Sequence, residues 1–190
     1  MTSRDPDSTS RPGSVVSVNL SPRKGMRKIP CRSAALVLDH GFEGDAHAGD
    51  WHRQVSLLAQ ESIDTMVAKG LTVGPGDFAE NITTTGIDLL ALPVGSVLRV
   101  GDGALLEISQ IGKVCHAHCA IYRQAGDCVM PREGLFAVVR EATEVRVGDA
   151  VEIVSLGDGT CDRTPQAAID EFARERAEEA ATAAAAANKE

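Results

Sequence analysis

The chain has 190 residues, 43% of them hydrophobic, and this length and apolar content predict one folded domain with tails. The formal net charge of −8 and the aromatic content of 3% argue against a nucleic-acid-binding protein, because such a protein needs a basic face and stacking side chains. No apolar run reaches the roughly 18 residues that span a bilayer, and the polar N-terminus lacks the apolar core of a signal peptide, so we expect a cytoplasmic protein without a membrane partner.

The first segments in chain order are a polar tail and a series of short apolar stretches. Residues 1–13 contain almost nothing apolar, so we expect a disordered tail. After it, segments rich in Val, Ile and Leu alternate with Gly, Pro and Asp turns. Strands are therefore predicted over residues 14–20, 34–38, 54–59, 81–85, 96–100, 104–111 and 150–155. A short helix is predicted over residues 62–69, with Gly70 placed to end it.

Two further segments complete the expected pattern. Residues 101–103 read Gly-Asp-Gly, which is a hairpin signal between the strands on either side. Residues 135–139 fit either a helical turn or a strand. Many short strands separated by Gly and Asp turns predict a mainly β protein, a barrel or sandwich with small helical insertions.

Residues 156–190 are expected to form a linker and an Ala/Glu-rich C-terminal helix. Thr164 is a good N-cap and Pro165 suits the first helical position. Ile169 and Phe172 recur at helical spacing, so the first turns are expected to pack on the domain. The helix is interpreted as an appendage, and the alternative is a helix that joins copies of the chain into a homo-oligomer.

The densest chemistry follows the predicted strand at 104–111. A lysine, two histidines and two thiols stand close together there: Lys113, Cys115, His116, His118 and Cys119. A thiol flanked by cations can ionise near neutral pH, and the thiolate attacks sulfur or binds a metal. On a strand, Lys113 and Cys115 share a face. Cys115 is therefore the candidate reactive residue, and the alternative is a buried, inert cysteine.

A structural metal centre is the rival interpretation of the thiols. Cys115, Cys119 and Cys128, with His116 or His118, are candidate ligands of zinc or of an iron–sulfur cluster. Their spacing lacks the paired Cys-x2-Cys knuckles that identify zinc sites. The chain needs no disulfide framework at this length, so its five cysteines are interpreted as reduced thiols.

A basic turn after the first predicted strand is the candidate anion-binding segment. It places four cations within residues 23–28: Arg23, Lys24, Arg27 and Lys28. Together with a glycine that lets the backbone approach, these side chains suit a phosphate or a carboxylate. The alternative is a solvated charged loop.

Two polar segments add candidates. Asp45 and His47 lie in a Gly-rich loop, where the carboxylate is expected to fix the tautomer of the imidazole. Arg53 enters the next strand and is a second anion contact. Asn81 and Thr83 lie on a strand, where their amide and hydroxyl groups suit the polar edge of a heterocycle, and a turn-forming Asn beside β-branched strand residues is an equal alternative.

The residues as a set resemble a MOSC domain, the C-terminal domain of molybdenum cofactor sulfurases. The resemblance rests on five motifs in this order: residues 44–49 (GDAHAG), 53–58 (RQVSLL), 80–82 (ENI), 92–95 (LPVG) and 112–116 (GKVCH). It covers about residues 14–155 and is nearest to the small stand-alone bacterial proteins, which also carry the stretch at 130–134 (MPREG). It implies a mainly β, MOSC-type barrel with small helical insertions and a C-terminal helix.

The resemblance also implies a function. Proteins of this kind bind the molybdenum cofactor (molybdopterin), or its tungsten analogue, and the family's cysteine matches Cys115, which either carries sulfur as a persulfide or ligates molybdenum. The residues that would contact the cofactor are Arg23, Lys24, His47, Arg53, Asn81, Thr83, Lys113, His116 and Arg132. The partners implied are proteins of molybdenum cofactor biosynthesis or client molybdoenzymes.

Three activities follow from the resemblance and stay open at this point. The first is the handling of cofactor sulfur or cofactor delivery through Cys115. The second is a molybdenum-dependent reductase of N-hydroxylated compounds, which would need an electron donor from a partner. The third is a non-catalytic carrier that stores the cofactor and passes it on.

Overall fold

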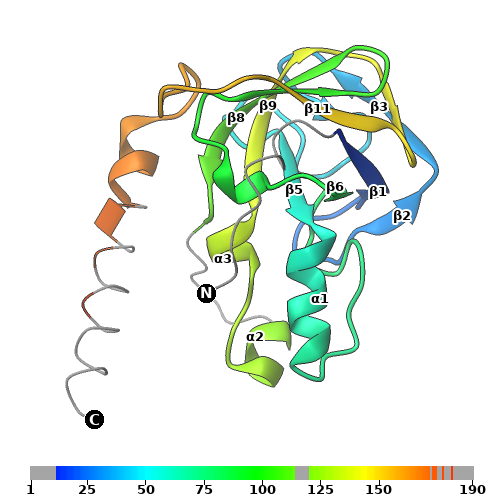
Figure 1. Ribbon diagram of the computed structural model, residues 1–190, viewed down its shortest axis with the longest axis vertical. Helices are drawn as coiled ribbons and strands as arrows, with labels where there is room; N and C mark the ends of the chain where they lie inside the picture. Colours follow the sequence, from blue (N-terminus) through cyan, green and yellow to red (C-terminus); the bar gives the residue numbers. More distant parts are fainter. Residues whose placement is uncertain (1–11, 114–119, 172, 175–176, 178–180, 182–190) are drawn as a thin grey trace.

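The computed structural model describes residues 12–113, 120–171, 173–174, 177 and 181 (Figure 1). Its strands are β1 (Gly13–Leu20), β2 (Ile29–Cys31), β3 (Ser33–Val37), β4 (Gly41–Phe42), β5 (Val55–Ala59), β6 (Ile82–Thr85), β7 (Val97–Val100), β8 (Ala104–Ile111), β9 (Leu135–Glu141), β10 (Glu144–Arg146) and β11 (Ala150–Ser155). Its helices are α1 (Gln60–Ala68), the 3-10 turn η1 (Leu89–Ala91), α2 (Ala120–Ala125) and α3 (Met130–Glu133). A further helix begins at Gln166. No described helix is both long and apolar enough to cross a membrane.

The main sheet closes on itself as a barrel. Its strands follow the order β11-β7-β8-β9-β5-β6-β1, and β1 pairs back onto β11 through Gly13 opposite Val151. β5 and β6 are parallel and the other neighbours are antiparallel. β2 extends the sheet from β1, and a small sheet of order β10-β3-β4 lies beside it. The predicted mainly β barrel is therefore confirmed.

The barrel is filled by one face of each strand. Along β9, Leu135, Ala137 and Val139 point into the barrel core, whereas Phe136 belongs to a second cluster outside it. This alternation is the two-residue period of a strand with both faces covered. The second cluster lies between the barrel wall and the helices, and it joins Ile63 and Met66 of α1 to Met130 of α3. β5 and β9 contribute to both clusters, through Leu57 and Leu58 and through Leu135 and Phe136.

Most predicted elements are confirmed, and the differences have local causes. Residues 135–141 form a strand that pairs with both β8 and β5, and every residue from Leu135 to Val139 is buried. α1 starts two residues earlier than expected. β2, β4 and β10 were not predicted, because two- or three-residue strands are defined by their partners and carry no period of their own.

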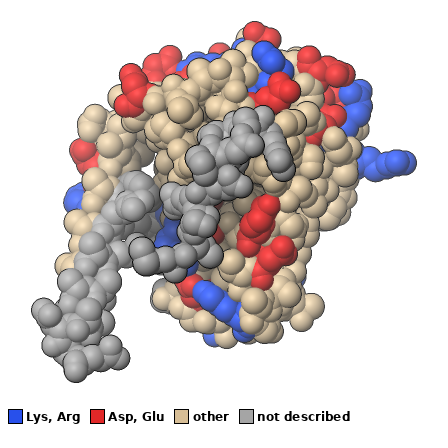
Figure 2. All heavy atoms as spheres, in the orientation of Figure 1, with Lys and Arg blue, Asp and Glu red and all other residues tan. Residues whose placement is uncertain are grey.

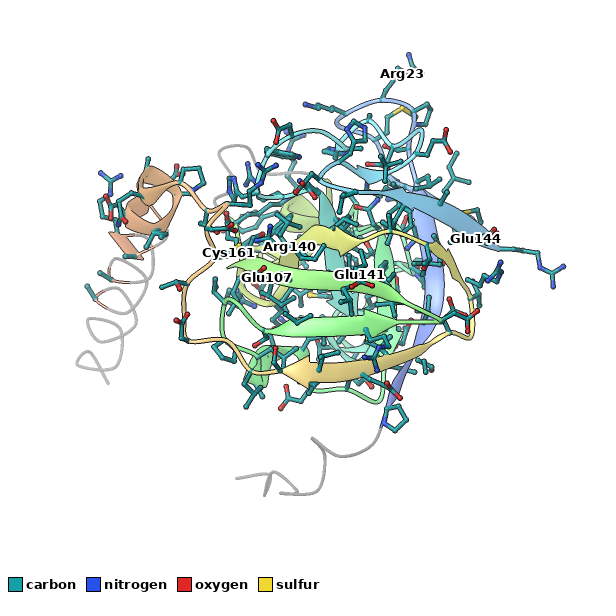
Figure 3. The ribbon with its side chains drawn as sticks, turned by 90° about the horizontal axis from the view of Figure 1, so that it is seen from above. Arg23, Glu107, Arg140, Glu141, Glu144 and Cys161 are labelled. Carbon is teal, nitrogen blue, oxygen red and sulfur yellow. The ribbon has the colours of Figure 1, made fainter. Side chains whose placement is uncertain are left out.

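The segment after β11 is tied back to the barrel. Arg163 forms ion pairs with Asp50 and Asp39, and the Thr164 hydroxyl donates to the carbonyl of Ser109 at 2.6 Å. Figure 3 shows Cys161 close to Arg140 and Glu107, and Arg140 pairs with Glu107 at 2.6 Å. The residues just before the C-terminal helix therefore contact the domain. Ile169, which was predicted to pack on it, is 43% exposed, and Phe172 lies outside the described residues.

A glycine in the turn before β6 makes the first testable prediction. Gly76 has a φ of +86°, and a Cβ there would lie 2.4 Å from the carbonyl oxygen of Lys28. We expect Gly76→Ala to lower the free energy of unfolding by roughly 2 kcal/mol or more, from backbone strain and the clash together. Denaturant unfolding measures this.

Gly74 is the matched control for that change. A Cβ at Gly74 meets no heavy atom within 4 Å. Gly74→Ala should change the free energy of unfolding by less than about 1 kcal/mol. Equal effects of the two substitutions would contradict the close approach of the Gly76 and Lys28 backbones.

Candidate functional site

One end of the barrel collects the segments that carry the candidate residues. At this end β1 finishes and β5 and β6 start, because Val18 lies opposite Ile82 and Ile82 lies opposite Leu57. β9 is antiparallel to β5, so β8 finishes and β9 starts toward the other end of β5. The loop before β5 nevertheless reaches the last residues of β8, where the Ser109 hydroxyl donates to the carbonyl of His52 and the Nε2 of His52 lies 2.9 Å from the side-chain oxygen of Gln110. The same loop contacts the basic turn, because Lys24 lies over the Trp51 ring.

A buried ion pair joins the basic turn to the loop before β5. The Nζ of Lys28 lies 2.6 Å from both carboxylate oxygens of Asp45, and the two side chains are each 1% exposed. Asp45 also accepts hydrogen bonds from the backbone N–H groups of Ser21 and His47, at 2.9 and 3.0 Å. The carboxylate thus ties three chain segments together.

Burial and charge set the protonation of this pair. Burial alone would raise the pKa of Asp45, but the hydrogen bonds that it accepts from Lys28, from Ser21 and from the backbone N–H of His47 hold it far below its ordinary value. Burial lowers the pKa of Lys28, the contact with Asp45 opposes this, and the charge of Lys113 lowers it further. Lys113 therefore lies within electrostatic range of the pair, although it follows β8.

A tryptophan organises the cations beside the pair. The guanidinium of Arg53 lies 4.8 Å from the centre of the Trp51 ring and 5.6 Å from that of Phe136, and the Nζ of Lys24 lies 5.9 Å from the Trp51 ring. The indole N–H of Trp51 donates to the carbonyl of His47 at 2.9 Å. Arg53 and Lys24 are thus gathered on one aromatic side chain by cation–π attraction.

The guanidinium of Arg53 is held in a water-poor setting. Burial lowers the pKa of Arg53, and the charge of Glu171, from the C-terminal helix, opposes this. The Nε of Arg53 is buried and has no hydrogen-bond partner among the described residues. A stacked, partly desolvated guanidinium with an unused donor suits a planar anion such as phosphate or carboxylate.

The segment that leads to Cys115 is held at its start. The backbone N–H of Gly112 donates to Gly134 at 2.6 Å, and that of Lys113 donates to Pro131 at 3.1 Å. The stretch at 130–134 therefore anchors Lys113 through its carbonyl groups. Cys115 and His116 lie outside the described residues, so their predicted roles stay predictions.

Two of the predicted basic residues lie apart from this cluster. Figure 3 shows Arg23 projecting away from the barrel. Arg132 pairs with Asp127 through two hydrogen bonds, at 2.6 and 3.1 Å. Lys24 is the residue of the basic turn that contacts Trp51, and Arg27 pairs with Asp77 at the surface.

Asn81 and Thr83 belong to a buried network in the barrel wall. The amide oxygen of Asn81 accepts from the N–H and the hydroxyl of Ser56, and its amide nitrogen donates to the carbonyl of Asn19 at 3.2 Å. The hydroxyl of Thr83 donates to Glu80 at 2.8 Å and accepts from Asn19. Both side chains are at most 1% exposed, so their polar groups hold β1, β5 and β6 together.

Three contributions were missed by sequence reasoning. In the sequence, Lys28 is one of four cations of the basic turn, with nothing to distinguish it from the others. In the structure it is the one cation of that turn that is buried, and it pairs with Asp45. Trp51 and Phe136 received no role, and they are the surfaces on which Arg53 stacks. The signal available for Trp51 was its position between a Gly-rich loop and Arg53 in a chain with a single tryptophan.

The cationic cluster is local. Figure 2 shows Lys and Arg side chains scattered among acidic ones over the described part of the face drawn there. A protein of net charge −8 can still hold a small anion where a few cations converge.

Comparison with known families places this arrangement in context. A family model for the MOSC domain matches residues 44–152, more than half of the chain. The chain belongs to the MOSC domain family. The match confirms the resemblance drawn from the motifs, and it runs from the loop that carries Asp45 into β11. A comparison with curated proteins found none that matches this MOSC chain.

Solved structures share the fold. The YuaD protein from Bacillus subtilis is 18% identical with a TM-score of 0.66, over 75% of this chain and 96% of that one. YiiM from Escherichia coli is 22% identical with a TM-score of 0.57, over 83% and 75%. YiiM from Geobacillus stearothermophilus is 20% identical with a TM-score of 0.57, over 76% of each chain. At these identities the likeness concerns the fold.

The buried pair makes a prediction about acid stability. Asp45→Asn leaves Lys28 buried without its counter-charge, so the free energy of unfolding near neutral pH should fall by about 3–5 kcal/mol. The pKa of Asp45 is lower in the folded than in the unfolded protein. Its contribution is therefore complete above the unfolded value of about 3.9 and is lost as pH falls through the folded value. Below about pH 4 the wild type should lose stability more steeply than the variant.

Glu152→Gln is the control for that experiment. Glu152 pairs with Arg99 at the surface, where both side chains are about half exposed. Its loss should cost less than about 1 kcal/mol. Similar costs for the two variants, measured by denaturant unfolding across pH, would show that the Lys28–Asp45 pair is not buried.

Proposed function

We propose that this MOSC protein binds the molybdenum cofactor and handles its sulfur, or its delivery to other proteins, through Cys115. The family association with this cofactor supports the proposal, and so does the cluster of cations around Trp51, with Lys113 as a further cation whose charge acts on Lys28. The observation that carries the proposal is the Arg53 guanidinium, which lies over the Trp51 and Phe136 rings and has a buried Nε with no hydrogen-bond partner among the described residues.

The side chains present fit the anionic part of such a cofactor. Asp45 neutralises Lys28, so the positive charge left for a guest comes from Lys24, Arg53 and Lys113. Arg53 offers a fixed, planar donor set for a phosphate, whereas Lys24 brings a mobile point charge. These are the residues that would hold the phosphate of the pyranopterin.

The cofactor would supply a soft metal–sulfur centre, for which a thiolate is a suitable partner. In this chain the thiol nearest in sequence to the cluster is Cys115, two residues after Lys113. Lys113 would then favour the thiolate form of Cys115 by its charge. We further propose that the protein acts in the cytoplasm, with proteins of cofactor biosynthesis or client molybdoenzymes as its partners.

Anion binding at the cluster can be tested with the single tryptophan of the chain. Arg53→Gln removes the charge while keeping a polar side chain, so the affinity for inorganic phosphate should fall by about tenfold or more. Rising salt should weaken binding to the wild type. Titration of Trp51 fluorescence with phosphate measures both effects.

Arg99→Gln is the matched control, because Arg99 lies on β7 and pairs with Glu152 at the surface. It should leave phosphate affinity unchanged within about twofold. Equal losses in the two variants would mean that the binding reflects overall charge, and the proposed cluster would be rejected.

The role of Cys115 is tested with the cofactor itself. Cys115→Ser and Cys115→Ala should retain the phosphate affinity of the wild type and lose sulfur handling, because neither side chain forms a thiolate. Mass mapping of sulfur on Cys115 and metal analysis of the purified protein are the measurements. Retained sulfur transfer in both variants would reject the role.

The same measurements separate the other two activities. A carrier would bind the cofactor reversibly with no added sulfur on Cys115. A reductase of N-hydroxylated compounds would hold about one molybdenum atom per chain and turn over a hydroxylamine with an added electron donor.

A further inference from the structure

His47 touches the buried ion pair through one ring nitrogen. Its Nδ1 lies 3.3 Å from the Nζ of Lys28 and 3.6 Å from the Oδ1 of Asp45. The Lys28 and Asp45 side chains are each 1% exposed, whereas that of His47 is 30% exposed. The imidazole therefore has one edge against the pair and another open to the surface.

The chemistry of Lys28 assigns the role of this nitrogen. An ammonium group has three N–H donors and no acceptor. Two of its donors reach the two oxygens of Asp45 at 2.6 Å, which leaves the third for His47. Only an unprotonated Nδ1 can accept it, so the hydrogen of the neutral imidazole lies on Nε2.

The carboxylate of Asp45 has no free acceptor position for a hydrogen bond from the ring of His47. Each oxygen of a carboxylate offers about two acceptor positions. Oδ1 accepts from Lys28 and from the N–H of His47, and Oδ2 accepts from Lys28 and from the N–H of Ser21. The distance of 3.6 Å from Oδ1 to the ring of His47 is also too long for a hydrogen bond.

We propose that Lys28 is a positioning residue that holds His47 as the tautomer with hydrogen on Nε2, so that His47 serves the site as a hydrogen-bond donor to an oxyanion. The sequence-based expectation assigned the tautomer to Asp45. Here Asp45 fixes Lys28, and Lys28 in turn fixes the imidazole. The oxyanion is that of the cofactor phosphate, and in this respect alone the inference rests on the proposed function.

The other charged groups near the pair are Glu80 and Lys113, and Glu80 favours the ammonium form of Lys28 that this assignment requires. The site then presents donors from several segments: Lys24, His47, Arg53 and Lys113. A guest rich in acceptors, such as phosphate, matches this set, and a cationic or donor-rich molecule does not.

The tautomer can be measured directly in the ligand-free protein. Nitrogen-15 NMR of the histidine rings at about pH 8, where imidazole is ordinarily neutral, separates a protonated from an unprotonated ring nitrogen. We expect His47 to show an unprotonated Nδ1 and a protonated Nε2. Comparison with His47→Gln assigns the signals, and a protonated Nδ1 in the wild type would overturn the proposal.

Lys28→Met tests the cause of the tautomer. Without the ammonium, the freed positions of the Asp45 carboxylate attract a donor, so the ring hydrogen should move to Nδ1 of His47. An unchanged tautomer in the folded variant would show that Lys28 does not set it. If this variant does not fold, the wild-type spectrum and the variants of His47 itself decide the question.

Phosphate binding tests what the donor does. The amide of Gln can place an N–H near the position of Nε2, so His47→Gln should bind inorganic phosphate within about threefold of the wild type, whereas His47→Leu should bind about tenfold more weakly. Equal affinity in the wild type and His47→Leu would refute the donor role. These readouts use neither the cofactor nor Cys115, so failure of the sulfur-handling function would leave them unaffected.

Discussion

The ion pair between Lys28 and Asp45 is the interaction on which the barrel end depends. It joins the turn after β1 to the loop before β5 where neither segment has sheet hydrogen bonds of its own. Removing two charges from water costs desolvation free energy. Here the hydrogen bonds offset that cost, because each Asp45 oxygen accepts two of them. The ion pair also helps to position Trp51, because the indole N–H of Trp51 donates a hydrogen bond to the carbonyl of His47, two residues after Asp45.

The pair also determines which charges remain for a guest. Lys28 is the most buried cation of the basic turn, and its charge is consumed internally. Arg27 pairs with Asp77, and Arg23 points away from the barrel. A turn with four cations thus supplies the cluster with Lys24 alone. Arg53, from the loop before β5, and Lys113, which follows β8, supply the rest, which is how an acidic protein concentrates positive charge at one place.

The fold could be predicted from sequence further than the site could. β8 and β11 have the predicted bounds, because alternating apolar residues between Gly-containing turns determine both the strand and its ends. The family could be recognised because its motifs lie in a fixed order. The partner of each polar residue could not be predicted, since it depends on which loops meet at the barrel end. Asn81 is an example: an amide beside a strand suits a ligand or a scaffold equally, and here its groups bond to Ser56 and Asn19.

Closure of the barrel has a consequence for how the chain reaches its native state. β1 has to meet β11, and Gly13 and Val151 are separated by nearly the whole domain. Contacts between such distant positions carry a large loop-closure entropy and tend to slow folding. During synthesis, the edge of β1 that pairs with β11 therefore stays exposed until the ribosome has released most of the domain. A shortened product that ends before β11 would leave the edges of β1 and β7 unpaired and would be prone to self-association through strand pairing.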